Sequence, residues 1–305
     1  ERRKPEDHDG AARAKKRNYI EALGRPSAAR GWHFLVGNER HIQQLADIVG
    51  FRFNYVPEQD EYAHPAAMII VTPGAKDAII AALDKKTGEV IWKSEMPDIG
   101  RKGGDGAAYS SVVISEAAGV KQYVQLTGRG VISVDAKDGK LLWGYNAIAN
   151  GTANIPTPII KGDYIFCSTG YGTGAALLKV VKSGEGLEAE EVYFLPAKEM
   201  QNHHGGMVLV GDHIYCGHGH NQGFPLCIEM MTGRPAWKPG RGAGEGSAAV
   251  LYADGHLYFR YENGTMALVE ATPKEYNLKG SFKLAKKNGP SWPHPWPPRR
   301  LPRCR

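Results

Sequence analysis

Histidine residues are concentrated in two short segments that are flanked by glycine. Residues 201–206 read Gln-Asn-His-His-Gly-Gly, and residues 216–221 read Cys-Gly-His-Gly-His-Asn. Imidazole nitrogens from neighbouring loops can bind zinc or copper. The candidate metal ligands are therefore His203, His204, His218 and His220. The same side chains are equally suited to hydrogen-bonding loop backbone or a polar ligand, and the sequence leaves these alternatives open.

Other polar and charged residues recur in segments that are predicted to connect strands. If the chain forms four-stranded sheets, the loops before each first strand and between each second and third strand meet on one surface. This surface, here called the loop face, is the predicted site for an unknown small molecule or protein. Its predicted members are Asp105, Tyr109, Arg129, Asn150, Thr152, Asn154, Tyr171, Asn202, His203, His204, His218, His220, Asn221, Arg241, Glu245, Arg260 and Glu262.

A repeated motif predicts the elements that position these residues. Residues 82–92 read Ala-Leu-Asp-Lys-Lys-Thr-Gly-Glu-Val-Ile-Trp, and related strings end at Trp143 and, more loosely, at Trp237. The glycine fits a tight turn that needs positive φ, and the tryptophan is expected to pack on the neighbouring unit. Turn dipeptides at 162–163, 211–212 and 254–255 each precede an alternating apolar strand. Four short strands in every ~47 residues are typical of a β-propeller blade.

The repeats predict an all-β propeller of about five four-stranded blades over residues 75–289. The first blade is expected to have three strands, near residues 68–73, 77–84 and 89–93, and to lack its innermost strand. Four further blades are expected near residues 108–145, 155–195, 206–238 and 247–283. Residues 290–305 are rich in proline and arginine, so we expect a disordered tail there.

The AxDxxTGxxxW motif resembles the repeat of the PQQ-type β-propeller family. The resemblance implies one of two functions, either a non-catalytic binding or scaffold module or a PQQ- and calcium-dependent oxidoreductase of the alcohol or sugar dehydrogenase type. Such enzymes use an Asp base, for which Asp105 is the candidate, and often a pair of adjacent cysteines that this chain lacks. Because a fold does not fix a function, the binding module is the primary prediction.

The N-terminal part of the chain has a different pattern. After a charged tail at residues 1–11, residues 12–74 are predicted to form a small α/β segment. Residues 31–37 read Gly-Trp-His-Phe-Leu-Val-Gly and residues 62–66 read Tyr-Ala-His-Pro-Ala. With these strings, the segment resembles the second half of the SCO/SenC family of thioredoxin-fold copper chaperones. The resemblance implies copper handling through His64, but no cysteine precedes Cys167 to supply the family's thiolate pair. Two partial domains joined near residues 72–74 indicate a fused or truncated chain, and both resemblances imply a periplasmic or otherwise extracytoplasmic location.

Composition and charge exclude other functions. The 305 residues carry a formal net charge of +6, but residues 1–25 and 299–305 hold 12 basic and 5 acidic residues, which leaves a nearly neutral body. Nucleic-acid binding, which needs a concentrated basic face, is therefore not expected. No apolar run approaches the ~20 residues of a membrane span. Residues 170–175 match a dinucleotide-binding string, but their place in the repeat predicts a hairpin.

Overall fold

The computed structural model describes residues 54–56, 61–63, 67–71, 80–84, 89–95, 97–104 and 108–284. The chain divides into two compact units, Glu1–Ala66 and Ala67–Arg305. In the first unit, the described strands β1 (Asn54–Val56) and β2 (Glu61–Ala63) form an antiparallel pair. Most of the α/β segment predicted over residues 12–74, including His64, and the predicted C-terminal tail lie outside the described residues.

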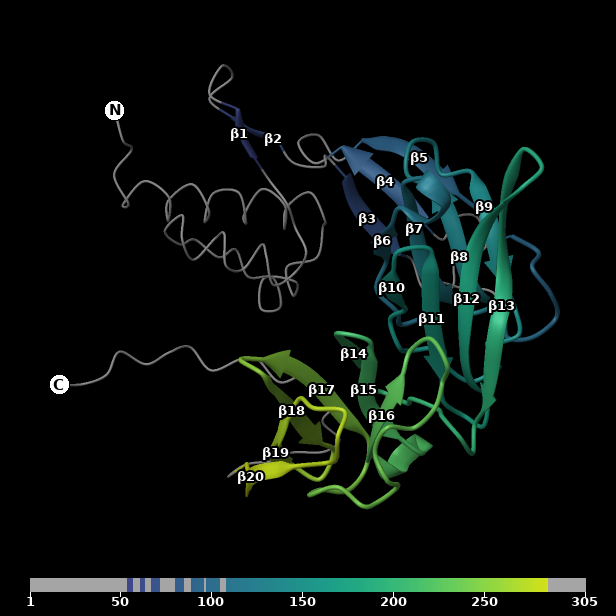
Figure 1. Ribbon diagram of the computed structural model, residues 1–305. Coiled ribbons are helices and arrows are strands. Elements are labelled where there is room, and N and C mark those ends of the chain that lie inside the picture. Colours follow the sequence, from purple (N-terminus) through teal and green to yellow (C-terminus); the bar gives the residue numbers. More distant parts are fainter. Residues whose placement is uncertain are drawn as a thin grey trace, which may run out of the picture. The chain divides into compact units, whose positions relative to one another are not determined.

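The second unit is a series of five antiparallel sheets that follow one another in chain order (Figure 1). Three sheets have four strands and two have three. The first sheet contains β3 (Ala67–Val71), β4 (Ile80–Asp84) and β5 (Val90–Ser94). The second contains β6 (Val113–Ser115), β7 (Gln122–Thr127), β8 (Gly130–Asp135) and β9 (Leu141–Tyr145), with the short 3₁₀ helix η3 (Ala117–Gly119) between β6 and β7. This architecture confirms the predicted all-β blade series.

The remaining three sheets carry most of the loop face. The third sheet contains β10 (Ile159–Lys161), β11 (Tyr164–Thr169), β12 (Gly174–Ser183) and β13 (Gly186–Pro196). The fourth contains β14 (Met207–Val210), β15 (His213–His218) and β16 (Phe224–Glu229), with the 3₁₀ helix η4 (His220–Gln222) between the last two strands. The fifth contains β17 (Ala248–Ala253), β18 (His256–Tyr261), β19 (Thr265–Glu270) and β20 (Leu278–Lys283).

Ring side chains connect each sheet to the next, as the repeat predicts. Trp92 lies over Gly139 of the second sheet, where a Cβ would come within 2.3 Å of the indole, and Gly139 has φ +75°. The indole N–H of Trp143 donates to Gln122 Oε1 at 2.7 Å, and its ring packs into the cluster shared with the third sheet. The indole N–H of Trp237 donates to the Thr272 carbonyl of the fifth sheet at 2.8 Å. Glycine is therefore needed at position 139 both for its φ and for the ring above it.

The fourth sheet differs from the prediction, because its expected outer strand is reduced to a single bridge between Ile228 and Pro235. The N–H of Ala236 still donates to the Cys227 carbonyl at 2.8 Å, and the N–H of Glu229 donates to the Arg234 carbonyl at 2.9 Å. The next outward-facing position of β16 is Pro225, which has no N–H to donate. Pairing therefore stops after one step, and the four-stranded blade expected over residues 206–238 has three strands.

Apolar clusters between successive sheets form the core. Val124, Ile165 and Leu178 belong to the cluster between the second and third sheets, and Phe166 and Ile214 belong to the one between the third and fourth. Three cysteines, Cys167, Cys216 and Cys227, are buried in these junctions as free thiols, and burial raises each thiol pKa to about 12. They are structural core residues, as their apolar surroundings predict.

The two glycine-rich strings serve as sheet connections. Thr169 pairs with Gly174, and the N–H of Thr173 donates to the Gly170 carbonyl at 3.2 Å, so residues 170–175 form the predicted hairpin. Residues 240–246 cross the face of Tyr261, where a Cβ on Gly244 would lie 2.3 Å from the phenol ring. Close approach to the ring explains this second glycine string.

Candidate functional site

Three histidines and a tyrosine from three loops form a compact cluster, here called the imidazole cluster. It consists of Tyr171 from the β11–β12 hairpin, His203 and His204 from the β13–β14 connection and His220 from η4. The ring centroid of His203 lies 3.7 Å from that of His204 and 4.0 Å from that of His220. The Tyr171 ring lies 5.0 Å from His203 and 4.7 Å from His220, edge-on to both. The structure brings these three loops together.

Unusual backbone conformations bring these rings together. Tyr171 and His220 both have positive φ, at 56° and 54°, a conformation that is uncommon for residues other than glycine, although histidine adopts it more often than most. Gly219 and Gly223, with φ of 84° and 62°, flank η4. A Cβ on Gly170 would lie 3.2 Å from His220 Nδ1. Local strain of this kind persists only where surrounding contacts over-determine the loop, so the cluster is held rigidly.

Hydrogen bonds fix the orientation of three imidazoles. His203 Nδ1 lies 2.8 Å from the Ser247 hydroxyl, which belongs to the connection that enters the fifth sheet. His218 Nδ1 accepts from the Gln201 N–H at 3.1 Å, and His220 Nδ1 accepts from the Tyr171 N–H at 3.4 Å. Each bond ties one loop of the face to another. The histidines therefore join neighbouring sheets at their loop ends.

Burial favours the neutral form of three histidines of the loop face. Desolvation, followed by the nearby His204 and His220, lowers the pKa of His203 to about 3, although the Asn221 side chain acts in the opposite direction. Desolvation also lowers the pKa of His204, where Glu262 opposes it, and the pKa of His218. Neutral imidazoles can sit against one another without charge repulsion.

The metal role predicted for His203, His204, His218 and His220 stays a prediction. Rings whose centroids lie 3.7 to 4.0 Å apart pack against each other instead of directing several nitrogens at a shared ion. Within the described residues, no group of three or more His, Cys, Asp or Glu side chains is arranged to hold a metal ion. The copper role of His64 stays a prediction, because that residue lies outside the described part.

Two predicted asparagines turn out to face inward. Asn154 Oδ1 accepts from the Asn150 N–H at 3.1 Å and from the Thr169 hydroxyl at 3.3 Å, and its amide donates to the Gly128 carbonyl at 3.0 Å. Asn150 Oδ1 accepts from the backbone N–H groups of Thr152 and Ala153, both at 2.8 Å. These amides stabilise the β9–β10 connection and tie it to the neighbouring loops.

Asn202 has a similar role one sheet later. Its side chain is fully buried, its amide donates to the Gly217 carbonyl at 2.9 Å, and its own N–H donates to the Ser168 hydroxyl of the third sheet at 3.1 Å. Residues 202 and 154 each lie five positions before a first strand. The structure therefore assigns both asparagines to the junction between sheets and not to the exposed surface.

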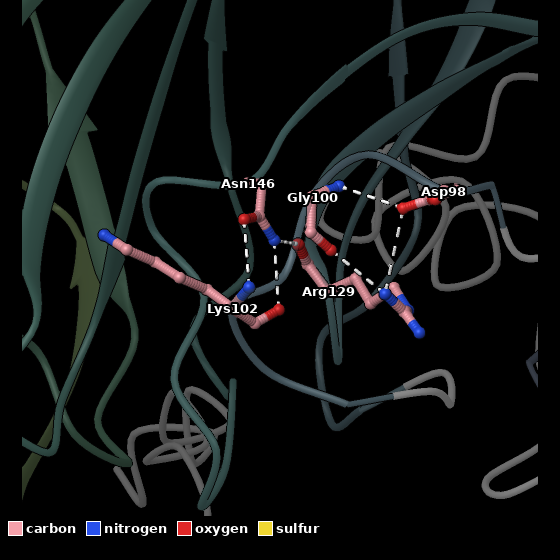
Figure 2. Close-up of polar contacts among 5 residues, drawn as sticks. All are labelled: Asp98, Gly100, Lys102, Arg129 and Asn146. Atoms are coloured by element: carbon pink, nitrogen blue, oxygen red, sulfur yellow. Dashed lines mark hydrogen bonds and ion pairs between the residues drawn. The ribbon is translucent and has the colours of Figure 1, made fainter.

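Arg129 is also occupied by a neighbouring loop, as Figure 2 shows. Its guanidinium donates to the Gly100 carbonyl at 3.0 Å and lies 4.0 Å from Asp98. Asn146 binds the same segment, because its Oδ1 accepts from the Lys102 N–H at 3.1 Å and its amide donates to the Lys102 and Arg129 carbonyls. Sequence reasoning missed Asn146, and its position directly after the outer strand β9 is the only signal for it.

The exposed members of the loop face are fewer than predicted. Tyr109 is 74% exposed, and Asn221, Arg241 and Glu245 are also exposed. The Arg241 guanidinium lies over the Phe224 ring at 5.9 Å. Of the remaining members, Glu262 accepts from the Ser247 N–H at 3.4 Å and Arg260 is half-buried in β18. Asp105, the candidate base, lies outside the described residues.

A protein-family model agrees with this architecture. The model described as "Outer membrane protein assembly factor BamB", a PQQ-type propeller model, matches residues 62–239, which is more than half of the chain. The chain belongs to this family. No curated protein sequence matches the chain.

Solved structures resemble the family fold at low sequence identity. BamB from Moraxella catarrhalis shares 16% identity with a TM-score of 0.50, over 78% of this chain and 65% of that protein. Quinohemoprotein alcohol dehydrogenase from Comamonas testosteroni shares 13% identity with a TM-score of 0.50, over 73% of this chain and 42% of the enzyme. The chain thus spans less than two thirds of either protein, and these likenesses establish the fold alone.

Enzymes of this fold use PQQ together with calcium. Calcium needs several oxygen ligands that are free to turn toward it. The side-chain oxygens of Asn150 and Asn154 instead accept hydrogen bonds within their own loops. These two residues do not fit the cofactor, and we derive no reaction step through it.

Proposed function

We propose that this chain is a non-catalytic binding module that docks a protein partner on its loop face, outside the cytoplasm, in the assembly of outer membrane proteins. The family match supports this proposal, because the matched model is described as an outer membrane protein assembly factor and covers the first four sheets. Among the described residues, no helix is long and apolar enough to cross a membrane.

One observation carries the proposal: the polar side chains that a reaction centre would need are used to connect loops. Asn154, Asn202 and His203 are buried, and each hydrogen-bonds to a neighbouring loop or sheet. A catalytic group must instead be within reach of a substrate. A loop face stiffened in this way is suited to binding, because a rigid surface loses little conformational entropy when a partner docks.

The side chains that remain exposed are of the types that anchor protein interfaces. Tyr109 and Arg241 extend from separate connections, and tyrosine and arginine are enriched among residues that dominate binding energy. Arg241 is supported from below by Phe224, so its guanidinium is partly pre-ordered. Asn221 and Glu245 add exposed hydrogen-bonding groups nearby in the chain.

The test is restoration of outer membrane protein assembly. The chain, given an export signal, is expressed in bacteria that lack their own protein of this family, and the amounts of several outer membrane proteins are measured. We expect partial restoration, and we expect Arg241→Glu to reduce it at least ~10-fold, in line with the cost of losing an interface anchor. Lys137→Glu is the matched control, because Lys137 is exposed in the β8–β9 turn at the opposite end of the strands.

Two results would contradict the proposal. Equal restoration by the Arg241→Glu and wild-type chains would remove the loop face from the function. Dye-linked oxidation of alcohols or sugars by the chain with added PQQ and calcium, abolished by Asp105→Ala, would instead support the quinoprotein oxidoreductase alternative.

A further inference from the structure

The outer strand of the fifth sheet lacks the ring side chain that the outer strands of the first three sheets carry. In three outer strands a ring occupies the position just before a bulge in the register: Trp92 opposite Ala82, Trp143 opposite Ser133 and Tyr193 opposite Leu177. In the fifth sheet the same position, opposite Leu268 and just before the same bulge, is Gly280. Among the described residues, no heavy atom lies within 4 Å of a Cβ built on Gly280. The described part of the chain therefore leaves open the place that a ring fills elsewhere.

Strand β20 is also the most exposed of these outer strands. All six of its residues are exposed, and two apolar side chains flank the open position, with Leu278 at 42% and Phe282 at 63% exposure. By contrast, β5 and β9 each bury a tryptophan, and β13 carries Glu188, Glu190 and Glu191 along its length. Among the described strands, β20 pairs with β19 alone. An exposed apolar edge is a template for pairing with another strand.

The hydrogen-bonding pattern of β20 defines which groups face outward. The N–H of Leu284 donates to the Gly264 carbonyl at 3.0 Å, on the β19 side. Because backbone groups alternate along a strand, Phe282 and Gly280 also direct theirs toward β19, and Ser281 and Lys283 direct theirs outward. The bulge breaks this alternation at Lys279, since the Asn277 carbonyl on its other side also faces β19 and accepts from the Glu270 N–H at 3.0 Å. The outer edge therefore offers the N–H and carbonyl groups of Ser281 and Lys283, and the carbonyl of Lys279.

We propose that β20 pairs with β20 of a second copy of this chain, antiparallel and centred on Ser281. In this register Ser281 faces Ser281, Lys279 faces Lys283, and each Phe282 lies opposite the Gly280 of the other copy. The outward-facing residues form the hydrogen-bonded pairs, while Gly280 and Phe282 form a non-hydrogen-bonded pair, in which side chains approach most closely. Each phenyl ring covers the other copy's glycine, an arrangement that stabilises glycines in sheets.

The charges of the strand are compatible with this register. Lys279 Nζ lies 2.7 Å from the Glu270 carboxylate of the adjacent strand. In the dimer, Lys283 of the second copy stands opposite Lys279 and reaches the same Glu270, so each carboxylate lies between two lysines. This contact offsets the repulsion that facing lysines would otherwise cause. A single six-residue edge is a small interface, so we expect a weak dimer that depends on concentration.

Sedimentation velocity on the full chain, from about 10 µM to about 500 µM, tests the proposal. The sedimentation coefficient of the wild type is expected to rise with concentration. Ser281→Pro removes the outward N–H at the centre without touching a bond to β19, and Phe282→Ala removes the ring, so each should weaken dimerisation at least 10-fold. Ser281→Thr, which keeps the N–H, is the matched control and should still dimerise.

Cysteine cross-linking tests the register independently of stability. In a Cys304→Ser background, Ser281→Cys is expected to form covalent dimers rapidly with a short bis-maleimide, because it faces itself across the two-fold axis. Leu278→Cys, which does not face itself, should react at least 10-fold more slowly. A wild type that stays monomeric at all concentrations, or equal cross-linking of the two cysteine variants, would overturn the proposal.

Discussion

At the residue scale, the contact between Trp92 and Gly139 shows how two requirements meet at one position. Gly139 needs a left-handed conformation for the turn and also leaves room for the indole above it. Gly255 has the same φ of +75° but has open space at its Cβ position. The two glycines therefore separate the conformational cost of a side chain from its steric cost.

This comparison gives the first prediction. Gly255→Ala should lower the free energy of unfolding by about 1 kcal/mol, the cost of a left-handed L-residue. Gly139→Ala should lower it by about 3 kcal/mol or more, because the new methyl group also displaces Trp92. Urea denaturation measures both. Equal losses for the two variants would show that the ring does not rest on the glycine.

The second residue-scale prediction concerns pH. His203 has a native pKa of about 3, and the pKa values of His204 and His218 are also lowered, so all three are neutral in the folded chain. In the unfolded chain histidine binds a proton below a pKa of about 6.5. Stability should therefore be complete above that pH and fall as the pH drops from about 6.5 toward 3, by about 1 kcal/mol per pH unit for His203.

Urea midpoints at pH 7.5, 6.0 and 5.0 measure this effect. His203→Gln should flatten the dependence, since glutamine has no proton to bind. His256→Gln is the control, because His256 belongs to the β17–β18 hairpin, away from the imidazole cluster. An unchanged pH dependence in His203→Gln would contradict the burial of a neutral imidazole.

At the scale of elements, the outer strands hold the sheets in sequence. Trp143 on β9 combines a buried indole with a hydrogen bond to Gln122 Oε1, which also accepts from the Ser133 hydroxyl at 2.6 Å. Trp143→Phe keeps most of the packing but removes the N–H, so unfolding should become easier by about 2 kcal/mol. Leu141→Ala, on the same strand but 39% exposed, should cost less than about 1 kcal/mol.

Chemical denaturation of these two variants locates the contribution of β9. If both variants lose the same stability, the ring of Trp143 does not carry the junction between the second and third sheets. Intrinsic fluorescence adds a local measurement, because only Trp143→Phe removes one of the six tryptophans of the chain.

The sequence predicts the elements well because their signals are local. Glycine turns and tryptophans mark each unit, and the resulting sheets lie close to the predicted ranges. The loss of the outer strand of the fourth sheet could not be predicted as easily. It depends on the backbone nitrogen of Pro225 facing the outer edge of β16, and that orientation is set by the register between β16 and β15. With the register shifted by one residue, the missing N–H of Pro225 would have faced β15 and weakened that pair instead.

The loop face was predicted less completely, for a related reason. Two residues predicted to lie on this surface, Asn154 and Asn202, direct their side chains inward to neighbouring backbone. The direction of a side chain in a loop depends on the φ value of its residue. Tyr171 and His220 adopt positive φ, which the sequence does not indicate because neither residue is glycine. Asn146 was missed because a single asparagine after a strand is a common pattern without a specific signal.

At the scale of the whole molecule, we propose that the loop face is a stiff docking surface and not a reaction centre. The family match, the internal use of its amides and the lowered pKa of the buried His203 support this proposal. Hydrogen bonds of Asn202 and His203 join these loops to the neighbouring sheets. We propose that a partner docks on the exposed Tyr109 and Arg241.

Calorimetric titration of PQQ into the full chain in the presence of calcium tests this claim most directly. If the loop face is a docking surface and not a cofactor site, PQQ should show no saturable binding. The titration should then be flat for both the wild type and Asn154→Ala. Saturable binding near one molecule per chain that Asn154→Ala abolishes would contradict this claim, because that asparagine would then serve the cofactor and not the junction between loops.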